Sequence, residues 1–218
     1  MTLKTIINRV RANTHDKDNL EYEDTTVIDY INDGIRFVRR TIMAIDPLQL
    51  VESPITGTLT PGQNTITPVN SKKMSAILEV RVDGVNLKKD TPWLIDNLAA
   101  TGSPKSYYVT GFGTINIWPV PTQKCEYTIL AVPDMKILSE ADDEFPMMND
   151  LADFVVEYAS IRSSLTNEFD VSQETAIMGS IVSQIEDMVR RYNTDSIQLS
   201  GYWESGEGLT CDYGRSYR

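Results

Sequence analysis

The sequence predicts an α+β fold: a helical bundle of about four helices with an inserted antiparallel β-sandwich or open barrel and an extended C-terminal tail. Three observations support this prediction. Apolar residues recur at helical spacing near the start of the chain and again after residue 150. Between these regions, residues 103–135 alternate apolar and polar side chains, with Gly and Pro at the breaks. From residue 196 onward neither pattern continues.

These patterns divide the chain into four predicted parts. We expect N-terminal helices over residues 1–50, an inserted β domain over 51–140, a C-terminal helical hairpin over 141–195 and an extended C-terminal tail over 196–218. The hairpin is expected to pack on the N-terminal helices, because each of its helices carries an apolar stripe that must be covered. A chain of 218 residues is long enough to bury one sizeable core or two small ones.

Two apolar stripes at helical spacing predict two helices within residues 1–50. The first stripe comprises Leu3, Ile6, Ile7 and Val10, and the second Val27 or Ile28, Ile31, Ile35, Val38 and Ile42. Thr26 followed by Asp29 resembles a capping box, so the second helix is expected to start there and to end near Asp46. Gly34 inside this helix indicates either a closely packed neighbour or a tolerated defect that costs up to about 1 kcal/mol relative to Ala.

The dipeptide Asp83-Gly84 predicts a two-residue β-hairpin turn, because both residue types tolerate the positive φ angles that such a turn needs. With these two residues as the loop, an apolar face pairs Val82 with Val85 and Val80 with Leu87, and a polar face pairs Arg81 with Asn86 and Glu79 with Lys88. Such a ribbon has the pattern of a half-buried antiparallel pair.

Three other segments complete the prediction for the β domain. Pro61-Gly62 predicts an earlier hairpin. Residues 103–135 predict a three-stranded meander, and residues 91–102 a short helix or an ordered loop. About five to seven strands in about 80 residues indicate a small sandwich or an open barrel.

Two further stripes predict the helical hairpin, with residues 167–172 between them. They comprise Leu151, Phe154, Val155, Tyr158, Ile161 and Leu165, and then Ile177, Ile181, Ile185, Met188, Val189 and Tyr192. The C-terminal tail that follows is rich in Gly and aromatic residues and cannot form a core of its own, so its aromatic residues are expected to pack on a partner. The candidate interaction residues are Tyr202, Trp203, Tyr213, Arg215, Tyr217 and Arg218.

The charge of the chain is uneven. The net charge is −11, and residues 141–218 contribute −10 of it, with five basic and fifteen acidic side chains. A surface of this sign repels phosphate, which disfavours sequence-specific nucleic-acid binding there. The acidic residues form either a solvated helical face or a dedicated surface for a partner.

The chain lacks the common catalytic motifs, since no GxxxxGK[ST], GxGxxG, HExxH or GxSxG pattern occurs. We therefore expect no catalytic residues, no cofactor and no enzyme activity. The single histidine, His15, lies in a polar stretch and is expected at the surface rather than as a general base. Cys125 and Cys211 are too few for a cysteine zinc site and are expected to be reduced and structural.

Two acidic groups are candidate sites. Asp16, Asp18 and Glu21 resemble part of a calcium loop, but Glu21 stands where that loop needs its turn glycine, so no metal site is expected. Asp142, Asp143 and Glu144 fit an exposed lead-in to a helix better than a catalytic pair. The chain has neither a run of about 18 apolar residues nor the apolar centre of a signal peptide, so no membrane association is expected and the protein should be made and kept in the cytosol.

The order of the segments resembles that of the head-to-tail adaptor (connector) proteins of tailed bacteriophages, particularly short-tailed ones, over about residues 1–195. The sequence pieces that carry this resemblance are the Tyr-Ile-Asn-Asp of residues 30–33 and the pattern of Pro104, Tyr107, Ile117, Pro119, Pro121 and Tyr127. The resemblance implies a virion structural protein, made in the cytoplasm of a bacterial host. It implies a homo-oligomeric ring, usually of twelve copies, between the portal protein and the phage tail or nozzle protein. DNA would pass through this ring without sequence-specific binding, and the family offers no catalytic residues.

The C-terminal tail is expected to order on assembly, against either the portal or an adjacent subunit. The acidic residues either line the passage for DNA or dock on a basic partner. Two other classes of protein stay open as alternatives to the adaptor. One is an enzyme with an unrecognised motif, and the other is a β-sandwich binding module of a virion, in contact with a receptor or glycan. In the binding module, exposed aromatic platforms would come from Trp93, Tyr107, Tyr108 and Trp118.

Overall fold

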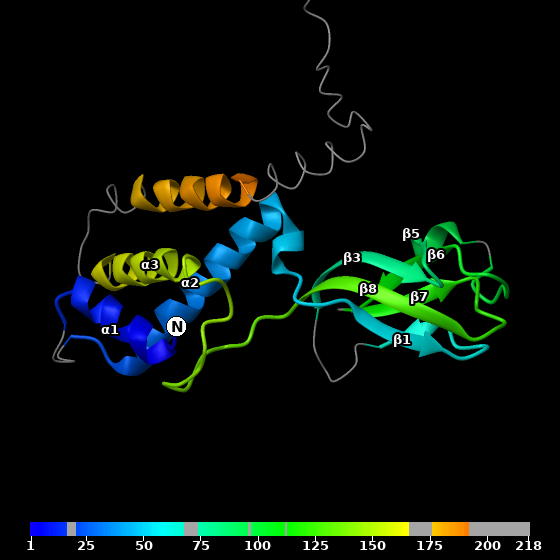
Figure 1. Cartoon of the computed structure of the whole chain (residues 1–218), viewed down its shortest axis with the longest axis horizontal. Helices are drawn as coiled ribbons and strands as arrows, with labels where there is room; N and C mark the ends of the chain where they lie inside the picture. The colour runs from blue at the N-terminus through cyan, green and yellow to red at the C-terminus, as the bar shows by residue number, and fades with distance from the viewer. Residues whose placement is uncertain (17–20, 68–73, 96, 112, 166–175, 192–218) are drawn as a thin grey trace, which may run out of the picture.

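Helices lie at one end of the molecule and β-strands at the other, joined by the segments around residues 51–54 and 134–138 (Figure 1). The computed structural model describes residues 1–16, 21–67, 74–95, 97–111, 113–165 and 176–191. Each end has its own cluster of buried apolar side chains. The fold is therefore α+β, as predicted, whereas the division of the chain at residues 50, 140 and 195 stays a prediction.

The helical end contains four helices among the described residues. They are α1 (Leu3–Asn13), α2 (Asp24–Ile45), α3 (Leu151–Leu165) and a helix over residues 176–191. The predicted stripes face inward for the most part, since Leu3, Ile31 and Ile35 are fully buried, as are Val155 and Ile181. Ile177, the first residue of the last stripe, is 38% exposed, and Tyr192 lies outside the described residues. The last helix and α3 run antiparallel, because Met188 and Val189 near the end of one line the same pocket as Leu151, the first residue of the other.

Helix α2 begins earlier than the capping-box pattern predicted. It starts at Asp24 with Glu23 as its N-cap, and no side chain caps it. Arg11 explains the difference, because its guanidinium binds the carboxylate of Asp24 at 2.7 Å and the carbonyl oxygen of Tyr22 at 3.0 Å. These contacts tie the first turn of α2 to α1, two residues before Thr26. The end of α2 at Ile45 agrees with the prediction.

Gly34 marks a close approach of α2 to α3. A Cβ atom on Gly34 would lie 3.2 Å from Tyr158 Cδ1, 3.2 Å from Val155 Cγ1 and 3.3 Å from the carbonyl oxygen of Val155. One turn further, the rings of Phe37 and Tyr158 stack with centroids 5.1 Å apart. Of the two alternatives for Gly34, the closely packed neighbour is therefore the one observed.

In the part of the chain that the structure describes, the strands form two sheets of four. The first has the order β1-β8-β3-β4 and comprises β1 (Ile55–Leu59), β8 (Cys125–Pro133), β3 (Met74–Val82) and β4 (Val85–Asn86). The second has the order β2-β7-β6-β5 and comprises β2 (Thr65–Ile66), β7 (Thr114–Trp118), β6 (Ser106–Thr110) and β5 (Lys88–Lys89). All pairs are antiparallel except β5 with β6. Because buried side chains of both sheets share one cluster, the β part is a sandwich (Figure 1).

The hairpin at Asp83-Gly84 is confirmed in its turn and first pairs. Both residues have positive φ angles, 48° and 79°, and Val82 pairs with Val85. The predicted pair of Glu79 with Lys88 is wrong. Lys88 begins β5 and pairs with Ser106 in the other sheet, while Glu79 lies opposite Leu130. The strand changes sheets after Leu87 because that side chain is buried in the core between the two sheets.

Two other β predictions need correction. Pro61-Gly62 forms a turn, but β1 before it pairs with β8 and β2 after it pairs with β7, so the turn connects two sheets instead of closing a hairpin. Within residues 103–135, β6 and β7 form a hairpin, but β8 leaves them and pairs with β1 and β3. Pro119 and Pro121 between β7 and β8 have no N–H to donate, which disfavours a tight hairpin at that point. The described residues of the stretch 91–102 include a short 3₁₀ helix, Pro92–Leu94.

Candidate functional site

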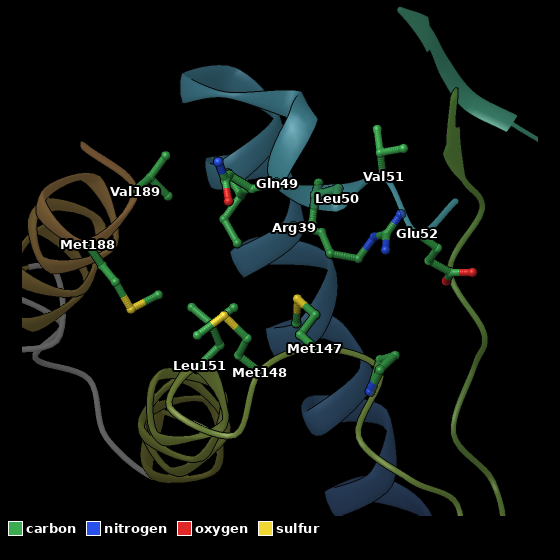
Figure 2. Close-up of a pocket in the computed structure, with 12 residues that line it drawn as sticks. Arg39, Gln49, Leu50, Val51, Glu52, Met147, Met148, Leu151, Met188 and Val189 are labelled. Atoms are coloured by element: carbon green, nitrogen blue, oxygen red, sulfur yellow. The ribbon is translucent and has the colours of Figure 1, made fainter. Parts of the chain in front are cut away.

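A cavity of about 130 Å³ opens in the helical end, between the C-terminal half of α2, the 3₁₀ helix η1 (Pro47–Leu50), the start of α3 and the helix over residues 176–191 (Figure 2). We call it the methionine pocket. The residues that line it are Arg39, Ile42, Gln49, Leu50, Val51, Glu52, Pro146, Met147, Met148, Leu151, Met188 and Val189. They come from four separate parts of the sequence.

Local hydrogen bonds place the pocket walls. The carboxylate of Asp46 accepts from the Leu48 backbone N–H at 3.1 Å and from Gln49 Nε2 at 3.0 Å, which holds η1 against the end of α2. On the opposite wall, the Leu151 N–H donates to the carbonyl oxygen of Met148 at 3.0 Å and begins α3. The pocket is thus built by the ends of helices.

The pocket combines an apolar interior with a polar rim. Three methionines, Met147, Met148 and Met188, line it together with aliphatic side chains, while Arg39, Gln49 and Glu52 supply the polar groups. Figure 2 shows the three methionines, Leu151 and Gln49 around one space, with Arg39 between them and Glu52. Methionine is flexible, and its sulfur makes favourable contacts with aromatic rings, so this lining suits an aromatic or aliphatic side chain. No nucleophile or acid–base pair converges on it among the described residues.

Arg39 lies where the chain leaves the helices and returns to them. Arg39 is only 9% exposed, and its Nη2 donates to the carbonyl oxygen of Pro133, the last residue of β8, at 2.7 Å. Burial lowers the pKa of the Arg39 guanidinium, and the charges of Asp134 and Glu52 oppose this shift. Arg39 therefore links α2 to the segment around residues 134–138, which returns from the sandwich to the helices. It lies beside the segment around residues 51–54, which leads out to the sandwich.

A second hollow, of about 460 Å³, lies on the other side of Arg39. Its lining residues are Arg36, Arg39, Arg40, Met43, Ser75, Asp134, Met135 and Ile137. Arg36 binds Asp33 at 2.5 Å, and Ile137 is 60% exposed. This arginine groove is basic in a chain whose net charge is −11, so it favours contact with an acidic surface.

The residues that the sequence indicated as candidates do not gather at either hollow. The candidate interaction residues of the C-terminal tail, Tyr202, Trp203, Tyr213, Arg215, Tyr217 and Arg218, lie outside the described residues, as does Cys211. His15 is exposed. Cys125 is buried as a free thiol, and burial, with a smaller contribution from Asp83, raises its pKa.

Asp16 holds a structural ion pair. Its carboxylate is buried and binds Arg11 at 2.7 Å, and it accepts from the backbone N–H groups of Glu21 and Tyr22. These partners occupy the oxygens that a cation would need. Within the part of the chain that the structure describes, no group of three or more His, Cys, Asp or Glu side chains could hold a metal ion.

The acidic run at residues 142–144 was expected to be an exposed lead-in to a helix, and for Asp143 this is wrong. Its carboxylate binds Lys136 and the backbone N–H groups of Ser139 and Glu140, and these contacts, the Lys136 bond foremost, lower the pKa of Asp143 well below its usual range. Its carbonyl oxygen accepts from the Leu3 N–H at 2.9 Å. The Asp143 carbonyl oxygen thus caps the start of α1, and the Asp143 carboxylate closes the turn that begins at Ser139.

The aromatic residues proposed as an exposed platform do not form one. Tyr107 is 3% exposed in the sandwich core, and burial raises its pKa. Trp118 donates Nε1–H to the carbonyl oxygen of Asn97 at 2.8 Å, while Trp93 is 93% exposed. With Tyr107 in the core, the platform cannot exist as predicted.

Sequence reasoning missed Arg39, Asn32 and the methionine pocket. Asn32 belongs to the Tyr-Ile-Asn-Asp piece, and the one available signal was a polar amide next to the apolar stripe of α2. For Arg39 no such signal exists, because an arginine near a helix end is ordinary. The described helices include none long and apolar enough to cross a membrane.

Comparison with protein families gives a match over most of the chain. The family model described as SU10 adaptor protein matches residues 1–198. No match was found among curated proteins. The matched range includes both hollows and every described helix and strand.

Proposed function

Because the chain belongs to the SU10 adaptor protein family, and is thus a phage adaptor-type structural protein and a virion component, we propose that it forms an oligomeric ring between the portal and the phage tail, through which DNA passes. The observation that carries this proposal is the family match over residues 1–198. The ring proposed is a homo-oligomer of twelve copies, with the portal on one side and a tail or nozzle protein on the other.

The architecture supports an assembly role. An apolar core at each end of the molecule makes each end able to present its own surface to a different neighbour. The tie between Arg39 and Pro133 holds the two ends in a defined relation. A ring subunit needs such a relation, since a heterologous interface closes only if every copy repeats the same rotation.

The charge supports passage of DNA without sequence-specific binding. Residues 141–218 carry −10 of the net charge, and Asp142, Glu144 and Asp150 are exposed. Carboxylates repel phosphates, so a channel lined by them lets DNA slide. We propose that the acidic residues line that passage or face a basic partner, and that the tail residues Tyr202, Trp203, Tyr213, Arg215, Tyr217 and Arg218 contact the portal or an adjacent subunit.

Electron microscopy of virions tests the proposal. The chain, identified by a fused peptide tag, should appear as a closed ring with rotational symmetry at the portal vertex. Virions of a phage that lacks the gene should keep their portal and lose the ring, and expression of the full chain in the host should restore it. Location of the tag on the capsid surface or at the distal end of the phage tail would contradict the proposal.

A further inference from the structure

The methionine pocket is comparable in size to a cavity that holds one six-membered aromatic ring. Its volume is about 130 Å³, against about 150 Å³ for an apolar cavity that holds one benzene molecule, so it can admit one ring of a side chain whose remainder stays at the opening. Three methionine sulfurs supply favourable contacts to an aromatic ring. The polar lining residues are Arg39, Gln49 and Glu52, and the oxygens of Gln49 and Glu52 can accept from an indole N–H or a phenol O–H. The chemistry that this pocket recognises is therefore an amphipathic aromatic side chain.

The chain itself supplies such side chains just beyond the pocket. Val189 lines the pocket, the described helix ends at residue 191, and the 27 residues from 192 to 218 follow. They include the adjacent pair Tyr202 and Trp203, next to Gly201. No other part of the sequence offers two aromatic residues in a stretch that lacks an apolar stripe of its own.

We propose that the methionine pocket of one copy binds Trp203 of a neighbouring copy, so that residues 192–218 link successive subunits. This inference rests on the proposed ring. An extended chain from Arg191 to Trp203 spans at most about 40 Å. Neighbouring domains of about 100 residues that touch lie about 30 Å apart, centre to centre, so the segment reaches the next pocket. Exchange of identical segments between copies is a common way to hold oligomers together.

Chemical cross-linking of assembled virions tests the inference. Met148, which is 46% exposed and lines the pocket, is replaced by Cys in one set of copies, and Ser205, two residues after Trp203, is replaced by Cys in another, both with Cys211→Ser. After treatment with a bismaleimide, virions that contain both sets should yield a cross-linked dimer. Trp203→Phe should keep most of this product, and Trp203→Ala should reduce it at least about tenfold.

A matched control places the first Cys at Ile137, which is 60% exposed and lines the arginine groove instead of the pocket. A ring that gives no cross-linked dimer, or as much dimer from Ile137→Cys, overturns the inference and leaves the proposed function intact. Copies that carry both Met148→Cys and Ser205→Cys distinguish cross-links within one chain from cross-links between chains. Links within single chains, without links between chains, would show that each pocket holds its own segment and would overturn exchange between copies. Virions without the chain at the portal vertex would remove the proposed function, and this inference with it.

Discussion

The side-chain amide of Asn32 binds the backbone of Leu138 through both of its polar atoms. Nδ2 donates to the Leu138 carbonyl oxygen at 2.9 Å, and Oδ1 accepts from the Leu138 N–H at 2.9 Å. Nδ2 also donates to the carbonyl oxygen of Ile28 in the preceding turn of α2. Asn32 thus pairs with the returning segment as a neighbouring strand would, and Leu138 is fully buried at that point.

Replacement of Asn32 should therefore destabilise the protein. Asn32→Leu removes both partners of the buried Leu138 backbone, and each unsatisfied group costs about 1–3 kcal/mol. We expect a loss of about 2–5 kcal/mol in the free energy of unfolding, measured by urea denaturation. Asn86→Leu, at an exposed strand position, is the control and should change stability by less than about 0.5 kcal/mol. Equal effects of both substitutions would show that the Asn32 contact adds nothing.

The same substitution at two helical glycines should have opposite effects. Gly34→Ala forces a methyl group against Val155 and Tyr158 at 3.2 Å, and the Val155 carbonyl at 3.3 Å cannot rotate away. Crowding of about 1–3 kcal/mol then exceeds the gain of about 1 kcal/mol in helix propensity. Gly179→Ala, in the helix over residues 176–191, meets nothing within 4 Å and should stabilise the protein by up to about 1 kcal/mol. Thermal unfolding of both variants measures the direction of each change in stability. If Gly34→Ala stabilises the protein, α3 must shift to make room for the methyl group.

Asp143 should contribute to the stability of the protein against acid. Its folded-state pKa is lowered from the usual 3.8, mainly by the bond to Lys136. A lowered pKa means that the stabilisation is complete above the unfolded-state pKa and is lost as the pH falls below about 4 toward the folded-state pKa. Asp143→Asn should therefore lower the unfolding midpoint at neutral pH, and the difference from the unmodified chain should shrink as the pH falls below about 4. The exposed neighbour Asp142→Asn is the control, and a constant difference across this pH range would contradict the prediction.

How far the sequence predicted the molecule depends on the range of each interaction. The helices and the Asp83-Gly84 turn depend on nearby residues, so local periodicity and turn chemistry were sufficient. The pairing of β8 with β1 and β3 joins Ile129 to Ile55 and Val80, which are far apart in the sequence, and alternation alone does not identify a partner strand. The methionine pocket could not be predicted for the same reason, since Arg39, Gln49, Met147 and Met188 meet only after folding.

Arg39 should hold the helical end and the sandwich in a fixed relation. Arg39→Met keeps much of the apolar length of the side chain but loses the 2.7 Å bond to the Pro133 carbonyl oxygen and the positive charge near Asp134 and Glu52. We expect a loss of about 1–3 kcal/mol in the free energy of unfolding. We also expect faster amide hydrogen exchange at residues 133–138, because the segment that returns to α2 would open locally.

Arg36→Met is the matched control, because Arg36 lies one turn earlier on the same helix, is exposed and pairs only locally with Asp33. Its loss should cost less than about 0.5 kcal/mol and leave the exchange at residues 133–138 unchanged. If both variants accelerate that exchange equally, the overall positive charge of α2 restrains residues 133–138, and the bond between Arg39 and Pro133 adds nothing to that restraint. If only Arg39→Met does so, one buried hydrogen bond restrains the segment that joins the two ends of the molecule. Subunits of the proposed ring would then depend on it to repeat one geometry.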